Sequence, residues 1–286
     1  MKKQITALIM SVAILTGGVN VSANSFDQQD TYRDSRIIEA RNYINKSTYE
    51  LTTELKKMEL SKGDLTLDEI EDIIHNYYKT NPAPISLARD ELVSIQDVFP
   101  EEINENQFYN QEKFEFNEFI NQHKESGEVI SFSSETTKTD VFIDRSGVFI
   151  LNSEIEPYNS LKSTSWSYTP NQRTSGTAYN ALGLKMFELW ASGSFRYDGS
   201  KVEVATKDGG YERKFWGSTL ELTDRGMGLS RNLDLEGYKY AEVYSRLRTE
   251  STLGFRWFGL TVTDTTVEVK IGSTVGGNVY TGGGSI

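Results

Sequence analysis

Hydrophobic residues in the first half of the chain recur with the 3.6-residue period of an amphipathic α-helix. The first such stripe has charged residues between its members and ends near Lys62 and Gly63. The capping-box sequence from Thr66 to Glu69 then predicts the start of a second helix, which Pro82 prevents from continuing. The predicted helices are residues 31–60, 66–79, 86–93 and 111–124.

From residue 129 the period changes to the 2-residue alternation that is typical of β-strands. A turn at Asp144–Gly147 predicts one hairpin, and Asp198-Gly199 predicts another, because both residues accept a positive φ. Glycine-containing turns recur at short spacing after residue 169, which favours an antiparallel sandwich or barrel. The predicted strands include residues 129–132, 140–144, 148–151, 215–222, 241–247, 255–263 and 266–271.

Five further segments complete the prediction. Residues 180–191 fit either a helix or a strand, and the glycine at 183 favours a long, bulged strand. We expect residues 154–168 to form a polar junction. The glycines at 209–210 and 276–277 predict hairpin turns, and the glycine-rich C-terminus predicts a mobile tail.

The N-terminus has the features of a secretory signal peptide. Lys2 and Lys3 are followed by an apolar run over residues 5–15 and by small residues that end at Ala23. The run is shorter than the roughly 20 residues that a membrane-spanning helix needs. We therefore expect cleavage between Ala23 and Asn24, and a secreted, extracellular protein with no transmembrane anchor in the mature chain.

Charge and composition divide the mature chain. Residues 24–163 hold 14 Lys and Arg against 28 Asp and Glu, whereas residues 164–286 hold 14 against 13, together with 18 of the 23 glycines and all four tryptophans. The acidity argues against nucleic acid as a partner. We expect an α+β protein with four parts: a signal peptide (1–23), an acidic helical region (24–127), a β-hairpin and junction (128–163), and a Gly/Trp-rich antiparallel β-sandwich-like domain (164–286).

The sequence favours few kinds of catalytic chemistry. It has no cysteine, and its two histidines, His75 and His123, lie in predicted helices, where packing or capping is their common role. No Gly-x-Ser-x-Gly or His-Glu-x-x-His motif is present. The acidic run 68–72 fits a solvated helix start better than a calcium site. We expect no metal or cofactor and favour a non-enzymatic protein, although a hydrolase with a pair of carboxylates stays open.

The aromatic residues of the second half give the main indication of binding. Exposed aromatic rings near basic groups can stack on sugars or lie at a membrane interface. Alternating aromatic residues also fill sandwich cores, and this alternative stays open for each of them. The candidate ligand-binding residues are Tyr211, Arg213, Trp216, Arg256 and Trp257.

The layout resembles the large secreted, cysteine-free bacteriocins of Gram-positive bacteria, such as the geobacillin group. The resemblance rests on the signal peptide, the acidic helical region, and the segments 177–183 and 193–199 with Trp190 between them, and it covers mainly residues 165–286. It implies an activity against other bacteria at their envelope, with no catalytic residues to transfer. We therefore expect a non-enzymatic protein that engages a bacterial cell surface as an antibacterial toxin. The alternative is a carbohydrate-binding β-sandwich module for cell-wall glycan, with a helical pro-region or regulatory region.

Overall fold

The computed structural model describes residues 24–87, 95–100, 120, 123, 129–156, 165–214, 220–235, 237–257 and 260–286. The chain divides into two compact units, Met1–Ser35 and Arg36–Ile286, and the description below concerns the second. Of the predicted cleavage site, Ala23 lies outside the described residues and Asn24 is the first residue of a helix.

The two predicted N-terminal helices are present as α1 (Asn24–Ser61) and α2 (Leu67–Thr80). The capping box is formed, since the Thr66 hydroxyl accepts from the backbone N–H of Glu69 and the Glu69 carboxylate accepts from the backbone N–H of Thr66. The structure describes residues 86 and 87 of the predicted helix 86–93, and both belong to a 3₁₀ turn, η1 (Ile85–Leu87). The one-turn helix α3 (Ile95–Val98) comes next among the described elements. The predicted helix 111–124 lies outside the described residues apart from Ile120 and His123, which are helical.

Seven strands form the first sheet, and every pairing in it is antiparallel. The order is β1-β2-β3-β5-β6-β4, and β7 also pairs with β6. Because β3 pairs with β5, strands from both sides of residue 163 belong to one sheet. The strands are β1 (Val129–Ser133), β2 (Thr137–Asp144), β3 (Gly147–Ile155), β4 (Ser167–Tyr168), β5 (Gln172–Asn180), β6 (Lys185–Tyr197) and β7 (Val202–Arg213).

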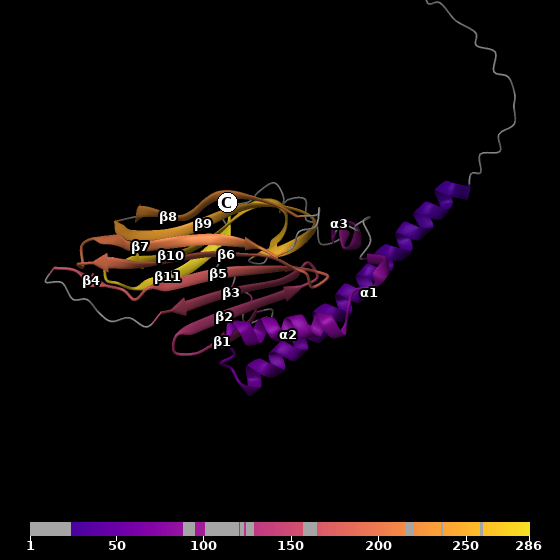
Figure 1. Ribbon diagram of the computed structural model, residues 1–286, viewed down its shortest axis with the longest axis horizontal. Helices are drawn as coiled ribbons and strands as arrows, with labels where there is room; N and C mark the ends of the chain where they lie inside the picture. Colours follow the sequence, from indigo (N-terminus) through magenta and orange to yellow (C-terminus); the bar gives the residue numbers. More distant parts are fainter. Residues whose placement is uncertain are drawn as a thin grey trace, which may run out of the picture. The chain divides into compact units, whose positions relative to one another are not determined.

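Four long strands form the second sheet, again with antiparallel pairing, in the order β11-β10-β9-β8. They are β8 (Leu220–Leu235), β9 (Tyr238–Trp257), β10 (Leu260–Thr274) and β11 (Val279–Ser285). Figure 1 shows them, orange to yellow, stacked on the first sheet.

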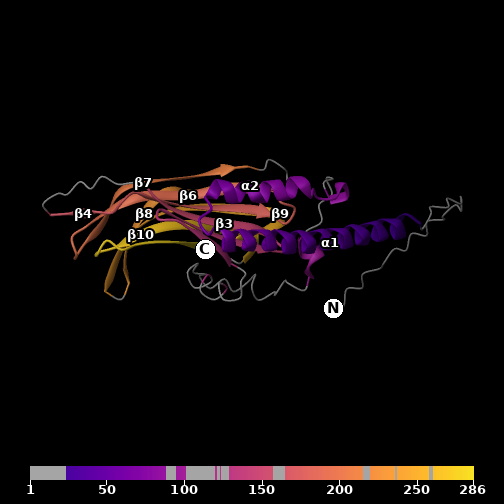
Figure 2. The same cartoon turned by 90° about the horizontal axis from the view of Figure 1, so that it is seen from below.

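Alternation along β3 shows how the layers are held together. Phe149 and Leu151 lie in the core between the two sheets, whereas Val148 and Ile150 lie in a second core that α1 and α2 share with the first sheet. A strand buried on both faces needs an uninterrupted apolar run, and residues 148–151 supply one. The helices lie against the β1–β3 side of the first sheet (Figures 1 and 2).

The predicted fold class, an α+β protein with a sandwich-like antiparallel β-region, is therefore confirmed. The core between the sheets includes Phe187, Leu189 and Phe195 from β6, and Val243 and Leu247 from β9. The four-part domain division stays a prediction.

Four expectations in the β-region are wrong. Residues 180–191 form the end of β5, a turn and the start of β6, because Asn180 and Gly183 (φ +79°) close a hairpin there. The expected strand 255–263 contains the end of β9 and the start of β10, with Trp257 paired to Leu260. Residues 207–211 lie inside β7, and the C-terminal tail forms β11.

Glycine has a packing role in the segment 207–211. A Cβ on Gly209 would lie 2.5 Å from the backbone nitrogen of Gly228 and 2.3 Å from the Ser245 hydroxyl oxygen. The two sheets thus approach so closely at this point that only glycine fits. The turn predicted at residues 276–277 is confirmed, with Gly277 at φ +81°.

Candidate ligand-binding cleft

The candidate binding residues that the structure describes are divided between the two sheets. Tyr211 and Arg213 lie on β7 in the first sheet, whereas Arg256 and Trp257 end β9 in the second sheet, where only the backbone is described. Trp216 lies outside the described residues.

The side chains of Tyr211 and Arg213 have structural partners. Tyr211 is partly buried and packs against the core between the sheets. Arg213 donates from Nη2 to the backbone carbonyl of Leu220, where β8 begins. The packing of Tyr211 fits the alternative in which an aromatic residue fills the sandwich core.

A cleft lies on the face of the second sheet that points away from the sandwich core. Along β9, Ala241 and Val243 are buried in that core. Tyr240, Glu242 and Arg246 alternate with residues of that core face, so they lie on the opposite face and line the cleft. The cleft has a volume of about 580 Å³. Its lining is Arg231, Leu233, Leu235, Tyr240, Glu242, Arg246, Glu268, Lys270, Tyr280 and residues 283–286.

Two nearly inaccessible carboxylates form the base of this lining. The side chains of Glu242 and Glu268 are 3% and 5% exposed. Arg231 joins them, with Nε 2.5 Å from an oxygen of Glu242 and Nη2 2.9 Å from an oxygen of Glu268. The Nε of Arg246 lies 2.7 Å from the other oxygen of Glu268. Buried charges need such partners, because an unpaired one would be strongly destabilising.

The network changes the protonation of Arg231. Burial lowers the pKa of its guanidinium, but the hydrogen bonds and charges of Glu268 and Glu242 outweigh burial and raise the pKa above its ordinary value. Arg231 is thus a permanent cation between two carboxylates, and its charge fixes their positions.

A tyrosine completes the wall of the cleft. The Tyr280 hydroxyl donates to Glu242 at 2.7 Å, and its ring packs edge-to-face against Tyr240, with ring centroids 6.0 Å apart. Burial, followed by the neighbouring charge of Glu242, raises the pKa of Tyr280 above its ordinary value. The hydroxyl therefore stays protonated as a donor at neutral pH.

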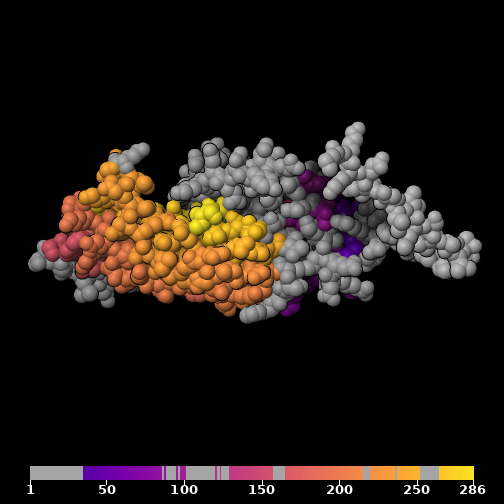
Figure 3. Space-filling model, turned by 90° about the horizontal axis from the view of Figure 1, so that it is seen from above, coloured from indigo at the N-terminus to yellow at the C-terminus, as the bar shows by residue number. Residues whose placement is uncertain are grey.

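The charged side chains that line the cleft sum to a net positive charge. Arg231, Arg246 and Lys270 supply three positive charges, and Glu242 and Glu268 supply two negative ones, which leaves +1. Two of the β11 residues that line the cleft, Gly283 and Gly284, have no side chain, so the backbone of β11 borders the cleft directly. Figure 3 shows these β11 residues, in yellow, on the visible face beside the orange strands.

The lining combines ion-paired side chains with two tyrosine rings. Each carboxylate is held by arginine, and neither histidine is part of the lining. Rigid polar groups beside two tyrosine rings are typical of sites that orient a polar ligand. In the sequence, the two-residue spacing of Tyr240, Glu242, Tyr244 and Arg246 could have indicated the site, but not its partners on β8, β10 and β11.

A second hollow lies at the β6–β7 hairpin. Its volume is about 480 Å³, and Trp166, Tyr197 and Asp198 contribute to its lining together with serines 165 and 167. The guanidinium carbon of Arg196 lies 5.0 Å from the centre of the Trp166 ring. Aromatic rings beside hydroxyl and carboxylate groups are the kind of surface that can receive a sugar.

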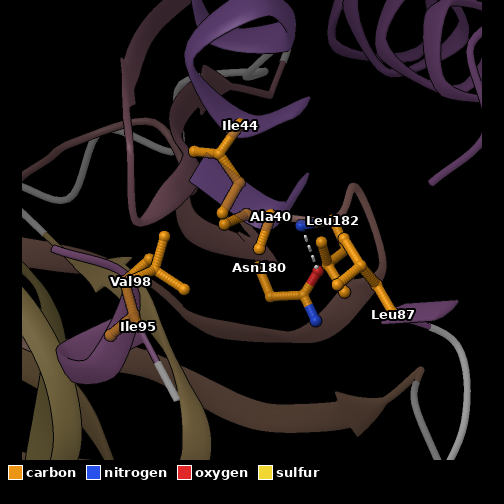
Figure 4. Close-up of a pocket in the computed structure, with 8 residues that line it drawn as sticks. Ala40, Ile44, Leu87, Ile95, Val98, Asn180 and Leu182 are labelled. Atoms are coloured by element: carbon orange, nitrogen blue, oxygen red, sulfur yellow. Dashed lines mark hydrogen bonds between the residues drawn. The ribbon is translucent and has the colours of Figure 1, made fainter. Parts of the chain in front are cut away.

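A small apolar cavity lies near the β5–β6 turn (Figure 4). Its volume is about 20 Å³, and Asn180 is the one polar side chain among the residues that line it. Asn180 is fully buried there, and its Oδ1 accepts from the backbone N–H groups of Leu182 and Leu184 at 3.0 Å. These bonds close the turn, so we assign the cavity a structural role.

Within the described part of the chain, no three His, Asp or Glu side chains are grouped so that they could hold a metal ion. No helix among those same residues is long and apolar enough to cross a membrane. Comparisons with protein-family models, with curated proteins and with solved structures gave no match.

Proposed function

We propose that this is a secreted, non-enzymatic protein that binds a bacterial cell surface, and that the cleft on β8–β11 is its binding site. The observation that supports the proposal best is the set of buried ion pairs that line the cleft. Glu242 and Glu268 lie on the face turned away from the sandwich core, where a sheet that only needed a soluble surface would expose its charges.

Rigidity is what such a network adds to a binding site. The side chains of Arg231, Arg246 and Tyr280 are each held by a buried carboxylate, so little conformational entropy is left for a ligand to remove. The resemblance to bacteriocin-like proteins supports an antibacterial outcome of the binding, in which the protein acts as a toxin at the envelope of other bacteria.

The test is the binding of purified mature protein, from Asn24, to intact Gram-positive cells, measured by co-sedimentation beside growth inhibition. Tyr240→Ala removes a ring from the cleft wall and should weaken cell binding several-fold. Tyr238→Ala is the matched control, because Tyr238 is 68% exposed and is not part of the lining. Equal binding by both variants would contradict the assignment of the cleft.

The second hollow favours an alternative, a carbohydrate-binding β-sandwich module with a helical pro-region or regulatory region. Trp166 and Tyr197 would contact the sugar rings of a cell-wall glycan. Quenching of tryptophan fluorescence by a glycan panel, lost in Trp166→Ala, would support it. The regulatory role of the helices predicts a protease-sensitive junction near residues 154–168, and resistance there would argue against that role.

A further inference from the structure

We infer that the cleft on β8–β11 recognises an oxyanion, a phosphate or carboxylate group, and that the Arg246 guanidinium is the group that binds it. This inference rests on the proposed function, since it names the chemistry of the ligand that the same cleft takes. Arg246 lines the cleft, and its side chain is 30% exposed.

The donor groups of Arg246 are used unequally. Its Nε donates to Glu268 at 2.7 Å. Among the residues that the structure describes, none accepts a hydrogen bond from its Nη1 or Nη2. By contrast, Arg231 uses Nε, Nη1 and Nη2 on Glu242 and Glu268. The two arginines of the network thus have different roles: Arg231 fills the buried part, and Arg246 retains donor groups for a ligand.

Two contacts fix the orientation of Arg246 before any ligand binds. Its Nε is held by Glu268, and its guanidinium carbon lies 4.5 Å from the centre of the Tyr244 ring. A planar guanidinium with free terminal nitrogens binds carboxylate and phosphate oxygens in a bidentate manner. Because the geometry is set in advance, the ligand does not bear the entropy cost of ordering this side chain.

The charge around Arg246 favours an anion over a cation or a neutral sugar. The side chains of the lining sum to +1, and the carboxylates of Glu242 and Glu268 are already neutralised by arginine. The next arginine on the same face of β9, Arg248, differs in this respect, because its Nη2 pairs with Glu250 and Asp264 outside the cleft. Arg248 is therefore a matched control on the same strand.

The experiment is calorimetric titration of the mature protein with inorganic phosphate, with acetate and with glucose. We expect saturable binding of an anion and none of glucose. Arg246→Gln should weaken anion binding at least tenfold, Arg246→Lys should retain part of it, and Arg248→Gln should leave it unchanged. Glu268 keeps its two bonds from Arg231 in the Arg246 variants, and a urea titration of each variant checks that it is folded.

Absence of saturable anion binding, equal weakening by Arg246→Gln and Arg248→Gln, or equal binding of glucose would overturn the inference. A second arm compares a phosphodiester-bearing wall polymer with wall material stripped of that polymer, which separates a polymer-borne anion from a free one. Cell binding that survives Arg246→Gln overturns the inference and keeps the proposed function. Anion binding without any cell binding supports the inference and contradicts the proposed function.

Discussion

The ring of Tyr280 on β11 occupies the space in which any side chain at Gly272 on β10 would lie. A Cβ at Gly272 would be 2.3 Å from Cζ and 2.4 Å from the hydroxyl oxygen of Tyr280. The two residues are direct partners across the β10–β11 pairing. The absent side chain lets the tyrosine reach across β10 to Glu242 on β9. One glycine therefore determines whether the wall of the cleft can form.

Gly272→Ala should displace the Tyr280 ring and weaken its hydrogen bond to Glu242. We expect a loss of about 1–3 kcal/mol in the free energy of unfolding, which is the usual cost of overpacking. Urea denaturation measures it. Gly276→Ala is the control, because the nearest atom to its added Cβ is 3.8 Å away, and this variant should unfold like the wild type. Equal stability of the two variants would contradict the account of the cleft wall.

Removing the arginine that joins the two carboxylates should have a larger effect. Arg231→Ala leaves Glu242 without its strongest partner and Glu268 with Arg246 alone, and we expect a cost of about 3–5 kcal/mol at neutral pH. The loss should shrink as the pH falls, because protonated glutamates no longer need a cation.

Arg248→Ala provides the comparison for Arg231. Its ion pairs with Glu250 and Asp264 are largely exposed, and pairs of that kind contribute about 0–1 kcal/mol. A similar loss of stability in both variants, at neutral and at acid pH, would show that the cleft network has no special structural role.

Two partly buried tyrosines predict a loss of stability in alkali. Burial raises the pKa of Tyr43 to about 12, and burial together with Glu242 raises the pKa of Tyr280 further above its ordinary value. Below the pKa of the unfolded chain, about 10, both states hold the proton and the stabilisation is complete. Above it the unfolded state releases protons that the native state retains, so stability falls as the pH rises toward the folded pKa.

The midpoint of urea denaturation, followed from pH 8 upward, measures this dependence. Tyr280→Phe should show a shallower decline in stability with pH than the wild type, because one such proton is removed. Tyr238→Phe, at an exposed position, should keep the wild-type slope. Identical slopes for all three proteins would contradict the predicted protonation of Tyr280.

The turn between β5 and β6 depends on one buried amide. Asn180→Ala removes the acceptor for the N–H groups of Leu182 and Leu184, and leaving such donors unpaired costs about 1–3 kcal/mol. Thermal or urea unfolding measures the loss. Asn171→Ala, which removes hydrogen bonds at an exposed site, should change stability by less than about 0.5 kcal/mol. Equal effects would show that the Asn180 amide does not close the turn.

Local signals in the sequence predicted local structure well. The capping box at Thr66 and the turn at Asp198 act within a few residues, and both elements form where they were expected. The glycines at 209–210 predict a turn, but Gly209 lies inside β7, where Gly228 of another strand comes close to it. No local pattern in the sequence reveals this approach. The C-terminal glycines predict a mobile tail, whereas they form a strand that pairs with β10.

The cleft was beyond prediction for the same reason. Alternation along β9 places Glu242 and Arg246 on one face, but their partners Arg231, Glu268 and Tyr280 come from three other strands. Only the register of the second sheet brings them together. Of the candidate binding residues, by contrast, Tyr211 and Arg213 lie on the first sheet, whereas Arg256 and Trp257 lie on the second.

The most direct test of the central claim is the binding of mature protein to intact Gram-positive cells, wild type beside Tyr240→Ala and Tyr238→Ala. The account predicts saturable binding that Tyr240→Ala weakens several-fold and Tyr238→Ala leaves intact. Absence of binding by the wild type, or equal binding by all three proteins, would contradict it.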